Sequence, residues 1–289
     1  MTALRDIGRA KINLTLEVLG RRSDGFHELK SLVAFASFGD DLELDPGGGL
    51  ELEVEGPFAA ALGDDNLILD AALAARASVT GLRLGRFRLG KLLPVAAGLG
   101  GGSAGAAAAL RLIARANPGL LRETALARLA PTLGSDVSVC LNSRPALMTG
   151  RGEKVEPVSG FPPCGVVLAN PGRALATQAV YAALHAEPLG AEPQHGAEKL
   201  DFHGDFAALL AYALPRRNDL EGPATNLLPD ITGVLAALSA LKGARLARLS
   251  GSGPTCFALL ATEEEARQGA ALLATQHPAW WVASGALEV

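Results

Sequence analysis

A glycine-rich loop followed directly by an alanine-rich segment constrains this 289-residue chain more than any other feature. The glycine loop reads Pro94-Val-Ala-Ala-Gly-Leu-Gly-Gly-Gly-Ser-Ala-Gly105, and residues 103–116 predict a buried helix packed close to its neighbours. Glycine permits positive φ angles and lets a ligand approach the main-chain amides. Because a helix N-terminus adds unpaired N–H groups and the positive end of a dipole, the segment favours a polyphosphate site over a plain tight turn.

Two familiar phosphate-binding loops fit this segment poorly. The Walker A loop ends in Gly-Lys-Ser or Gly-Lys-Thr, and the sequence has no such ending. Gly100, Gly102 and Gly105 match the spacing of the dinucleotide fingerprint. That fingerprint follows a buried parallel strand, whereas residues 83–89 alternate between polar and apolar like an antiparallel strand.

Composition narrows the class of protein. The net charge is −4 and no block of Lys and Arg occurs, which disfavours a polynucleotide partner, while 49% hydrophobic residues allow a sizeable core. No apolar run reaches the ~18 residues of a membrane span. Residues 1–20 lack a signal-peptide core and the three cysteines have no metal-like spacing, so we expect a cytoplasmic protein with buried thiols.

Strand patterns dominate the first part of the chain, and helices alternate with strands later. We therefore expect an α+β fold of two lobes, with an N-terminal domain at 1–155 and a C-terminal domain at 156–289. Residues 41–45 and 50–54 predict a hairpin around Pro46-Gly-Gly-Gly49. Residues 187–204, rich in Pro, Gly and charge, predict an exposed or mobile loop.

Three polar residues are candidates for chemistry. Lys11 and Asn13 stand two apart on a predicted strand and so face the same side, either as a solvated face or as a binding pair for a phosphate or hydroxyl. Asp136 follows Leu133-Gly-Ser and is either a helix N-cap or a base that accepts a proton from an attacking hydroxyl. A neighbouring Lys11 would keep that carboxylate ionised.

Three further positions each have a structural and a functional interpretation. Phe26-His27 follows a glycine turn, where an aromatic ring beside a histidine can stack on and read a nucleobase. Asn66 is either a helix N-cap or part of a site. Ser250-Gly-Ser-Gly-Pro254, hereafter the C-terminal glycine turn, is a plain turn or a second loop of close approach.

Three segments together resemble the GHMP kinase superfamily: Ala10-Lys-Ile-Asn-Leu14, the glycine loop, and Leu249-Ser-Gly-Ser-Gly-Pro-Thr-Cys-Phe257. Other strings resemble the branch that acts on a cytidine diphosphate methylerythritol, and they follow in order along almost the whole chain. They are Arg22-Ser-Asp-Gly-Phe-His27, Asn66-Leu-Ile68, Gly98-Leu-Gly-Gly-Gly-Ser103, Leu133-Gly-Ser-Asp136 and Asn218-Asp-Leu-Glu221. The resemblance implies a two-lobed GHMP kinase fold with the active site in the cleft between the lobes.

The same resemblance implies that ATP, with Mg²⁺, phosphorylates the 2-hydroxyl of the methylerythritol unit in the non-mevalonate isoprenoid route. Asp136 is then the base and Lys11 its partner. The substrate-binding residues it implies are Asn13, Phe26, His27, Thr177, Tyr181 and Gly251, with His27 reading the cytosine edge and the rings of Phe26 and Tyr181 sandwiching it. The ATP-binding residues it implies are Asn66, Lys91, Pro94, Gly98, Leu99, Gly100, Gly101, Gly102, Ser103 and Ala104. Of these, Asn66 and Lys91 would line the adenine pocket.

Two other functions stay open at this point. A homoserine or mevalonate-type kinase would share the glycine loop, but it has no cytosine for His27 to read. A catalytically silent nucleotide-binding protein would need neither Lys11 nor Asp136. The sequence departs from the branch pattern at Phe26, where tyrosine is frequent, and at Ala104, Ser135 and Ser138. We expect a monomer or weak homodimer that binds no nucleic acid and no membrane.

Overall fold

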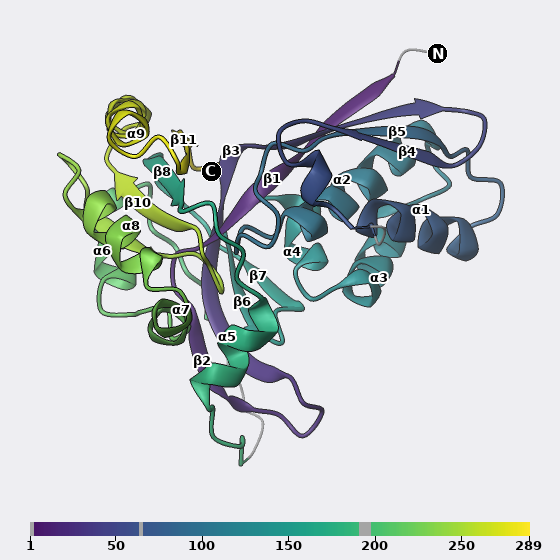
Figure 1. The fold of residues 1–289 in the computed structure, drawn as a ribbon. Coiled ribbons are helices and arrows are strands. Elements are labelled where there is room, and N and C mark those ends of the chain that lie inside the picture. Colours follow the sequence, from purple (N-terminus) through teal and green to yellow (C-terminus); the bar gives the residue numbers. More distant parts are fainter. Residues whose placement is uncertain (1–2, 64–65, 191–197) are drawn as a thin grey trace. The chain divides into compact units, whose positions relative to one another are not determined.

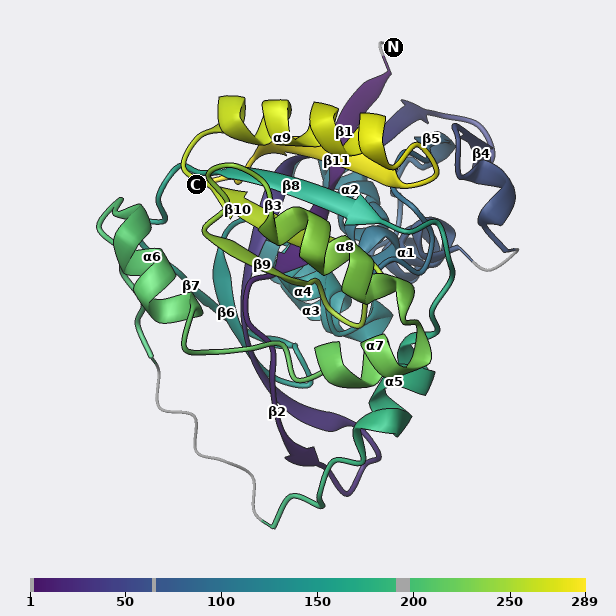
Figure 2. The same ribbon diagram turned by 60° about the vertical axis from the view of Figure 1, so that its left-hand side comes forward.

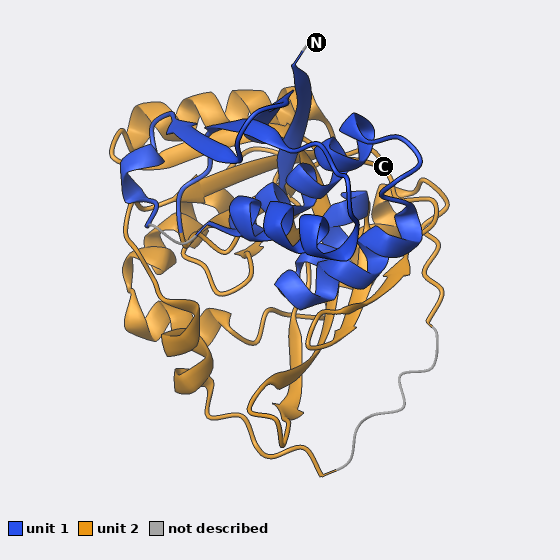
Figure 3. Cartoon of the chain, turned by 90° about the vertical axis from the view of Figure 1, so that its right-hand side faces the viewer, with its two compact units in different colours: residues 1–10, 38–95, 100–143 blue, residues 11–37, 96–99, 144–289 orange. Residues whose placement is uncertain are grey.

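The computed structural model describes residues 3–63, 66–190 and 198–289 (Figure 1). The chain forms two compact units, coloured separately in Figure 3. Unit 1 comprises residues 1–10, 38–95 and 100–143, and unit 2 comprises residues 11–37, 96–99 and 144–289. Two strands, β1 (Leu4–Asn13) and β3 (His27–Pro46), contribute residues to both units. The expected division near residue 155 follows the chain order, whereas these units interleave, and that division stays a prediction.

Unit 1 packs its helices around the alanine-rich helix. Besides parts of β1 and β3, its elements are β4 (Glu51–Glu55), the 3-10 turn η1 (Ala59–Ala61), α1 (Leu67–Ser78), β5 (Gly85–Gly90), α2 (Gly101–Ala116), α3 (Glu123–Leu133) and α4 (Val137–Asn142). Both α1 and α4 pack on α2, most of whose alanines are buried, as predicted for a helix with close neighbours. Small side chains on α2 let the neighbouring backbones approach closely.

The expected hairpin of residues 41–54 is wrong. Residues Asp41–Pro46 of β3 pair antiparallel with β5, and β4 pairs parallel with the other edge of β5, so β5 lies between them. The charges explain this order. Arg88 of β5 faces Glu43 of β3 and Glu53 of β4, with N–O distances of 3.3 and 3.2 Å. A hairpin would instead place acidic side chains of the two strands against one another, which is destabilising.

Unit 2 is built on an antiparallel sheet with strand order β11-β8-β10-β9. Its elements, besides parts of β1 and β3, are β2 (Glu17–Arg21), β6 (Ala146–Gly150), β7 (Lys154–Pro157), β8 (Gly165–Asn170), α5 (Thr177–Leu184), α6 (Phe206–Ala213), α7 (Glu221–Leu227), α8 (Asp230–Ser239), β9 (Leu246–Leu249), β10 (Cys256–Leu260), α9 (Glu263–Gln276) and β11 (Trp281–Ala286). Helices α8 and α9 cover one face of the sheet (Figure 2) and share a core with β8 and β10.

Several local predictions are confirmed. The three cysteines are buried, as expected, and burial raises the pKa of Cys164 to about 12. β6 and β7 form a hairpin around Gly150-Arg-Gly152. The α+β class is confirmed by the mixture of helices and sheets. Among the helices that the structure describes, none is long and apolar enough to cross a membrane. Residues 191–197 of the expected loop at 187–204 lie outside the described residues.

Charge reversal at Arg88 tests the strand order. We expect Arg88→Glu to lower the free energy of unfolding by about 1 kcal/mol, because it replaces two partly exposed cross-strand attractions with repulsions. Urea unfolding measures the effect, which should shrink as salt is added. The control is Arg128→Glu on α3, where the guanidinium donates to the Thr124 carbonyl of its own helix. Equal losses in both variants would contradict the role of the charges.

Candidate functional site

The glycine loop passes close to the C-terminal glycine turn within unit 2. Gly98 has φ +75°, and a Cβ placed on it would lie 2.2 Å from the Ser250 carbonyl oxygen and 2.7 Å from the Gly253 nitrogen. Neither atom can move aside easily, because both belong to the backbone. The position therefore requires glycine, both for its φ angle and for the space.

Hydrogen bonds join three distant parts of the sequence at this point. The Ser250 hydroxyl donates to the Gly98 carbonyl at 2.9 Å and accepts from the Asn13 backbone N–H at 3.4 Å. The Lys11 backbone N–H donates to the Leu99 carbonyl at 2.9 Å. Ser250 and Leu99 are buried. The end of β1, residues 96–99 of the glycine loop and the C-terminal glycine turn thus form one assembly in unit 2.

The rest of the glycine loop opens α2 in unit 1. Gly100 is the N-cap residue with φ +65°, and the Ala104 N–H donates to its carbonyl, the first bond of the helix. The helix begins at Gly101, two residues before the predicted start, so the N–H groups of residues 101–103 come before the first N–H that donates within the helix, that of Ala104. Gly102 is exposed, and the first turn of α2, described in full, holds no acidic residue. This N-terminus is open to an anion.

A buried ion pair anchors the segment that leads into the glycine loop. The Lys91 ammonium donates to Asp40 Oδ2 at 2.7 Å and to the Leu93 carbonyl at 2.6 Å. The other Asp40 oxygen accepts the backbone N–H groups of Leu92 and Leu93. Lys91 and Asp40 are 4% and 2% exposed, so each needs the other as a counter-charge. Half-buried Pro94 follows directly.

This pair changes the interpretation of two positions. The ammonium of Lys91, expected beside the adenine, is engaged by Asp40 within unit 1. A Cβ on Gly101 would lie 3.5 Å from both Asp40 Oδ2 and Lys91 Nζ, so a larger side chain there would press on the ion pair. Sequence reasoning missed Asp40, because its partner lies 51 residues away and no local motif marks it.

Asn66 caps a helix. Its Oδ1 accepts the Ile68 backbone N–H at 3.0 Å, at the start of α1. The capping interpretation therefore accounts for one polar atom of this side chain, and its expected place beside the adenine stays a prediction.

Lys11 and Asn13 do not form a solvated face. They are 5% and 4% exposed, and Asn13 Nδ2 donates to the Ser31 hydroxyl at 2.8 Å. That hydroxyl donates in turn to the Thr15 carbonyl at 2.6 Å. A Cβ on Gly251, which has φ +55°, would lie 3.4 Å from Asn13 Oδ1. Asn13 and Gly251, both expected at the substrate, are thus neighbours.

Asp136 directly precedes α4 and is half-buried. Within the described residues its carboxylate makes no capping hydrogen bond to α4, so the N-cap interpretation is not supported. A Cβ on Gly134 would lie 3.9 Å from the Ser103 hydroxyl, which brings the segment of Asp136 beside the first turn of α2. Asp136 belongs to unit 1 and Lys11 to unit 2, and their pairing stays a prediction.

The aromatic residues expected at the nucleobase lie in unit 2. The rings of His27 and Tyr181 are 4.8 Å apart, with 32° between their planes. Burial lowers the pKa of His27, and the positive charge of Arg21 lowers it further. A neutral imidazole has one donor and one acceptor nitrogen, which suits a nucleobase edge. Phe26 is 50% exposed, and the Arg151 guanidinium lies 4.7 Å from its ring centroid.

Thr177 lies at the start of α5, and its hydroxyl is 2.8 Å from the Ser252 hydroxyl. The C-terminal glycine turn therefore contacts α5 as well as the glycine loop and β1. In residues 3–63, 66–190 and 198–289, no three His, Cys, Asp or Glu side chains gather closely enough to hold a metal ion. Mg²⁺ often keeps several waters and binds through one or two carboxylates plus substrate phosphates, which needs no such cluster.

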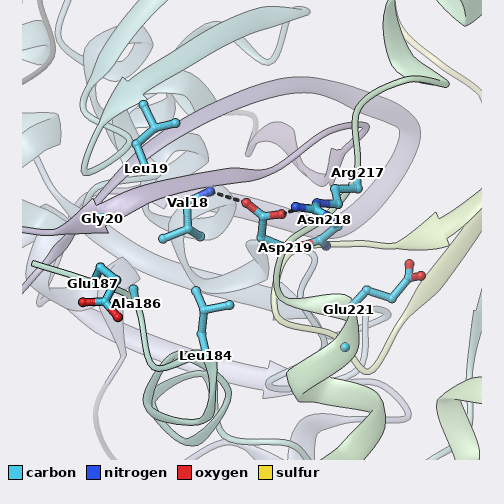
Figure 4. A pocket seen from close by; sticks show the side chains of 11 residues that line it. Val18, Leu19, Gly20, Leu184, Ala186, Glu187, Arg217, Asn218, Asp219 and Glu221 are labelled. Atoms are coloured by element: carbon cyan, nitrogen blue, oxygen red, sulfur yellow. Dashed lines mark hydrogen bonds and ion pairs between the residues drawn. The ribbon is translucent and has the colours of Figure 1, made fainter. Parts of the chain in front are cut away.

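Unit 2 also has a cavity of about 580 Å³ between β2, the end of α5 and the start of α7 (Figure 4). It is lined by Val18, Leu19, Gly20, Leu184, Ala186, Glu187, Arg217, Asn218, Asp219, Glu221 and Gly222. These lining residues, all within the described part of unit 2, include no predicted site residue.

Two family models match parts of this chain. The model of the GHMP kinases N terminal domain matches residues 66–144, and that of the GHMP kinases C terminal region matches residues 199–277. The 4-diphosphocytidyl-2-C-methyl-D-erythritol kinase of Parvibaculum lavamentivorans is 49% identical over 280 residues, covering 96% of each chain. The kinase of that name from Methylorubrum extorquens is also 49% identical, covering 98% of each.

Solved structures agree. A crystal structure of 4-(cytidine 5'-diphospho)-2C-methyl-D-erythritol kinase matches with a TM-score of 0.78 and 33% identity, covering 99% of this chain and 100% of that one. Homoserine kinase from Cytophaga hutchinsonii matches with a TM-score of 0.69 at 16% identity, covering 99% and 95%, which shows the fold alone. With nearly half of its residues identical to relatives along almost its full length, this chain belongs to the 4-diphosphocytidyl-2-C-methyl-D-erythritol kinase family of GHMP kinases.

Proposed function

We propose that this protein transfers the γ-phosphoryl group of ATP to the 2-hydroxyl of 4-diphosphocytidyl-2-C-methyl-D-erythritol, giving the 2-phosphate and ADP. One observation carries the proposal: the glycine loop is bonded through Leu99 and Gly98 to Lys11 and Ser250 of the two other GHMP segments. The relatives' names supply the substrate. The product belongs to the non-mevalonate route to isoprenoids, and we expect it to be made in the cytoplasm.

In the proposed reaction the ATP phosphates lie on the amides at the start of α2. The open N-terminus of a helix without acidic residues in its first turn stabilises that negative charge. Asp136, beside this turn, accepts the proton of the 2-hydroxyl. The hydroxyl oxygen bonds to the γ-phosphorus, the bond from that phosphorus to its bridging oxygen breaks, and ADP leaves. Mg²⁺ bound to the ATP phosphates would neutralise part of their negative charge.

The substrate would be held by unit 2. Asn13, oriented by Ser31, and Gly251 lie side by side at the end of β1 and would contact the sugar-alcohol end. Neutral His27 would pair with the cytosine edge, and the ring of Tyr181 lies against the imidazole of His27. The buried ammonium of Lys11 would stabilise charge at the reacting hydroxyl. We also expect the protein to act as a monomer or a weak homodimer.

A substrate panel tests the reaction. Purified protein with ATP and Mg²⁺ is given the cytidine substrate, homoserine or mevalonate, and ADP release is measured. We expect turnover of the cytidine substrate at least about a hundredfold above the others, because a site built to hydrogen-bond a base rejects ligands that lack it. Preference for homoserine or mevalonate would replace the proposal, and ATP binding without transfer to any alcohol would favour a silent nucleotide-binding protein.

Removal of the base tests the role of Asp136. We expect Asp136→Asn to lower kcat by about 10²- to 10⁴-fold, since the amide cannot accept the hydroxyl proton. ATP affinity, measured by calorimetry, should change little. Asp230→Asn, at the exposed start of α8, serves as the matched control and should keep wild-type turnover. Near-normal turnover by Asp136→Asn would reject the base assignment.

His27 should govern the cytidine substrate and not ATP. For His27→Ala we expect KM for the cytidine substrate to rise roughly tenfold to a hundredfold, since a partner of the base is lost. KM for ATP should stay nearly constant, and the exposed His203→Ala should resemble the wild type.

The pH dependence has a defined sign. Because the pKa of His27 lies below its ordinary value of 6.5, the imidazole stays neutral to lower pH, and the acceptor is lost only when the pH falls through the lowered value. KM for the cytidine substrate should therefore be flat at neutral pH and rise only in more acid solution. A rise already above pH 6.5, or equal effects on both substrates, would contradict the assignment.

A further inference from the structure

The segment Asn218-Asp-Leu-Glu221 has no part in the reaction described above, yet its polar groups bond to the backbone beside the site. Asn218 is 3% exposed, and its Nδ2 donates to the Leu249 carbonyl at 2.9 Å and to the Gly251 carbonyl at 2.8 Å. Its Oδ1 accepts the Leu220 N–H at 3.0 Å. Both amide hydrogens are therefore spent on the carbonyls that flank Ser250.

Glu221 adds a further hydrogen bond to Leu249, the last residue of β9. Its Oε2 accepts the Leu249 N–H at 2.9 Å, so the same segment holds Leu249 at both its N–H and its carbonyl. Three backbone groups on the two residues that flank Ser250 are thus fixed by two side chains.

The segment also holds the chain just beyond Asn13. Asp219 Oδ2 accepts the Val18 N–H at 2.8 Å, and the Asp219 N–H donates to the Leu16 carbonyl at 2.8 Å (Figure 4 shows the carboxylate between Val18 and Arg217). The Leu16 N–H donates to the Arg217 carbonyl at 2.9 Å. One segment therefore anchors both the continuation of β1 and the C-terminal glycine turn.

Ser250 connects the residues that Asn218 holds to the glycine loop. The Ser250 hydroxyl bonds the Gly98 carbonyl and the Asn13 N–H, and the Gly98 backbone lies too close to Ser250 to admit a Cβ. A displacement of the turn therefore moves Gly98 and Asn13 with it. Misplacement of reacting groups by about 1 Å can cost roughly a hundredfold in rate.

We propose that Asn218 is a positioning residue for phosphoryl transfer, which holds the C-terminal glycine turn so that Ser250 sets the placement of Gly98 and Asn13. The role rests on the proposed function. Only a group with two hydrogens can serve both carbonyls while accepting a third bond, and this is the chemistry of a primary amide. A carboxylate of the same shape would set a negative charge against two carbonyl oxygens.

Asn218→Asp tests this role, and Asn117→Asp is a matched control. Asn117 is also 3% exposed, and its Nδ2 donates to the Arg83 and Ile113 carbonyls while its Oδ1 accepts the Arg83 N–H. It lies at the far end of α2 from the glycine loop. Each variant loses two equivalent bonds, so thermal unfolding should shift by similar amounts in both.

Kinetics separates the two variants. For Asn218→Asp we expect kcat to fall roughly tenfold to a hundredfold with ATP affinity changed by less, because alignment is lost and the phosphate contacts remain. For Asn117→Asp we expect kcat within about twofold of the wild type, because its lost bonds lie away from the reacting groups. Equal kcat in the two variants overturns the positioning role. An inactive wild-type protein overturns the proposed function itself, and with it this role.

Ser250→Ala decides the matter if Asn218→Asp does not fold. It removes the link to Gly98 and Asn13 and leaves the Asn218 amide intact, so kcat should fall in the same way. In a folded double variant the losses should be less than additive, because both residues act through one turn. Wild-type kcat in Ser250→Ala, or full additivity in the double variant, contradicts the proposal.

Discussion

The close approach of Gly98 to the C-terminal glycine turn is the contact on which the proposed site depends. A single added carbon atom would fall 2.2 Å from the Ser250 carbonyl oxygen. This leaves the two backbones one relative arrangement, which the Ser250 hydroxyl then fixes by bonding the Gly98 carbonyl. Since the same hydroxyl accepts the Asn13 N–H, the glycine loop and the end of β1 share one reference point. Their spacing depends on backbone contact and on one short, buried side chain.

Local patterns were enough to predict the alanine-rich helix and the strand before the glycine loop, and they failed where distant charges decide. Nothing within residues 41–54 shows that β5 will lie between β3 and β4, because the arginines that separate their glutamates come later in the sequence. The sequence of helix α7 carries no clear helix signal, because Gly222 and Pro223 resemble a loop. Both lie in its first turn, where a helix needs no N–H from proline.

The proposed site divides in the same way. Lys11, Asn13 and the glycine loop were found from motifs, because chemistry restricts which residues occur there. Asp40 and the role of Asn218 were not found, since each bonds the backbone of a segment distant in sequence. Asp40 bonds Leu92, 52 residues away, and Asn218 bonds Leu249, 31 residues away. Spacing along the chain carries no signal for such a contact. It becomes visible only as a buried polar group with its partners satisfied.

Each unit holds its own end of the glycine loop with buried polar groups. In unit 1 the Lys91–Asp40 pair fixes the backbone of Leu92 and Leu93 before the loop. In unit 2 Asn218 and Ser250 fix the turn against Gly98. Glycine-rich backbone loses much conformational entropy when it is ordered. If folding has already ordered it, binding of ATP does not bear that cost. Phosphoryl transfer depends mainly on the positioning of the reacting groups. The buried contacts that fix the glycine loop therefore bear on the rate of the proposed reaction.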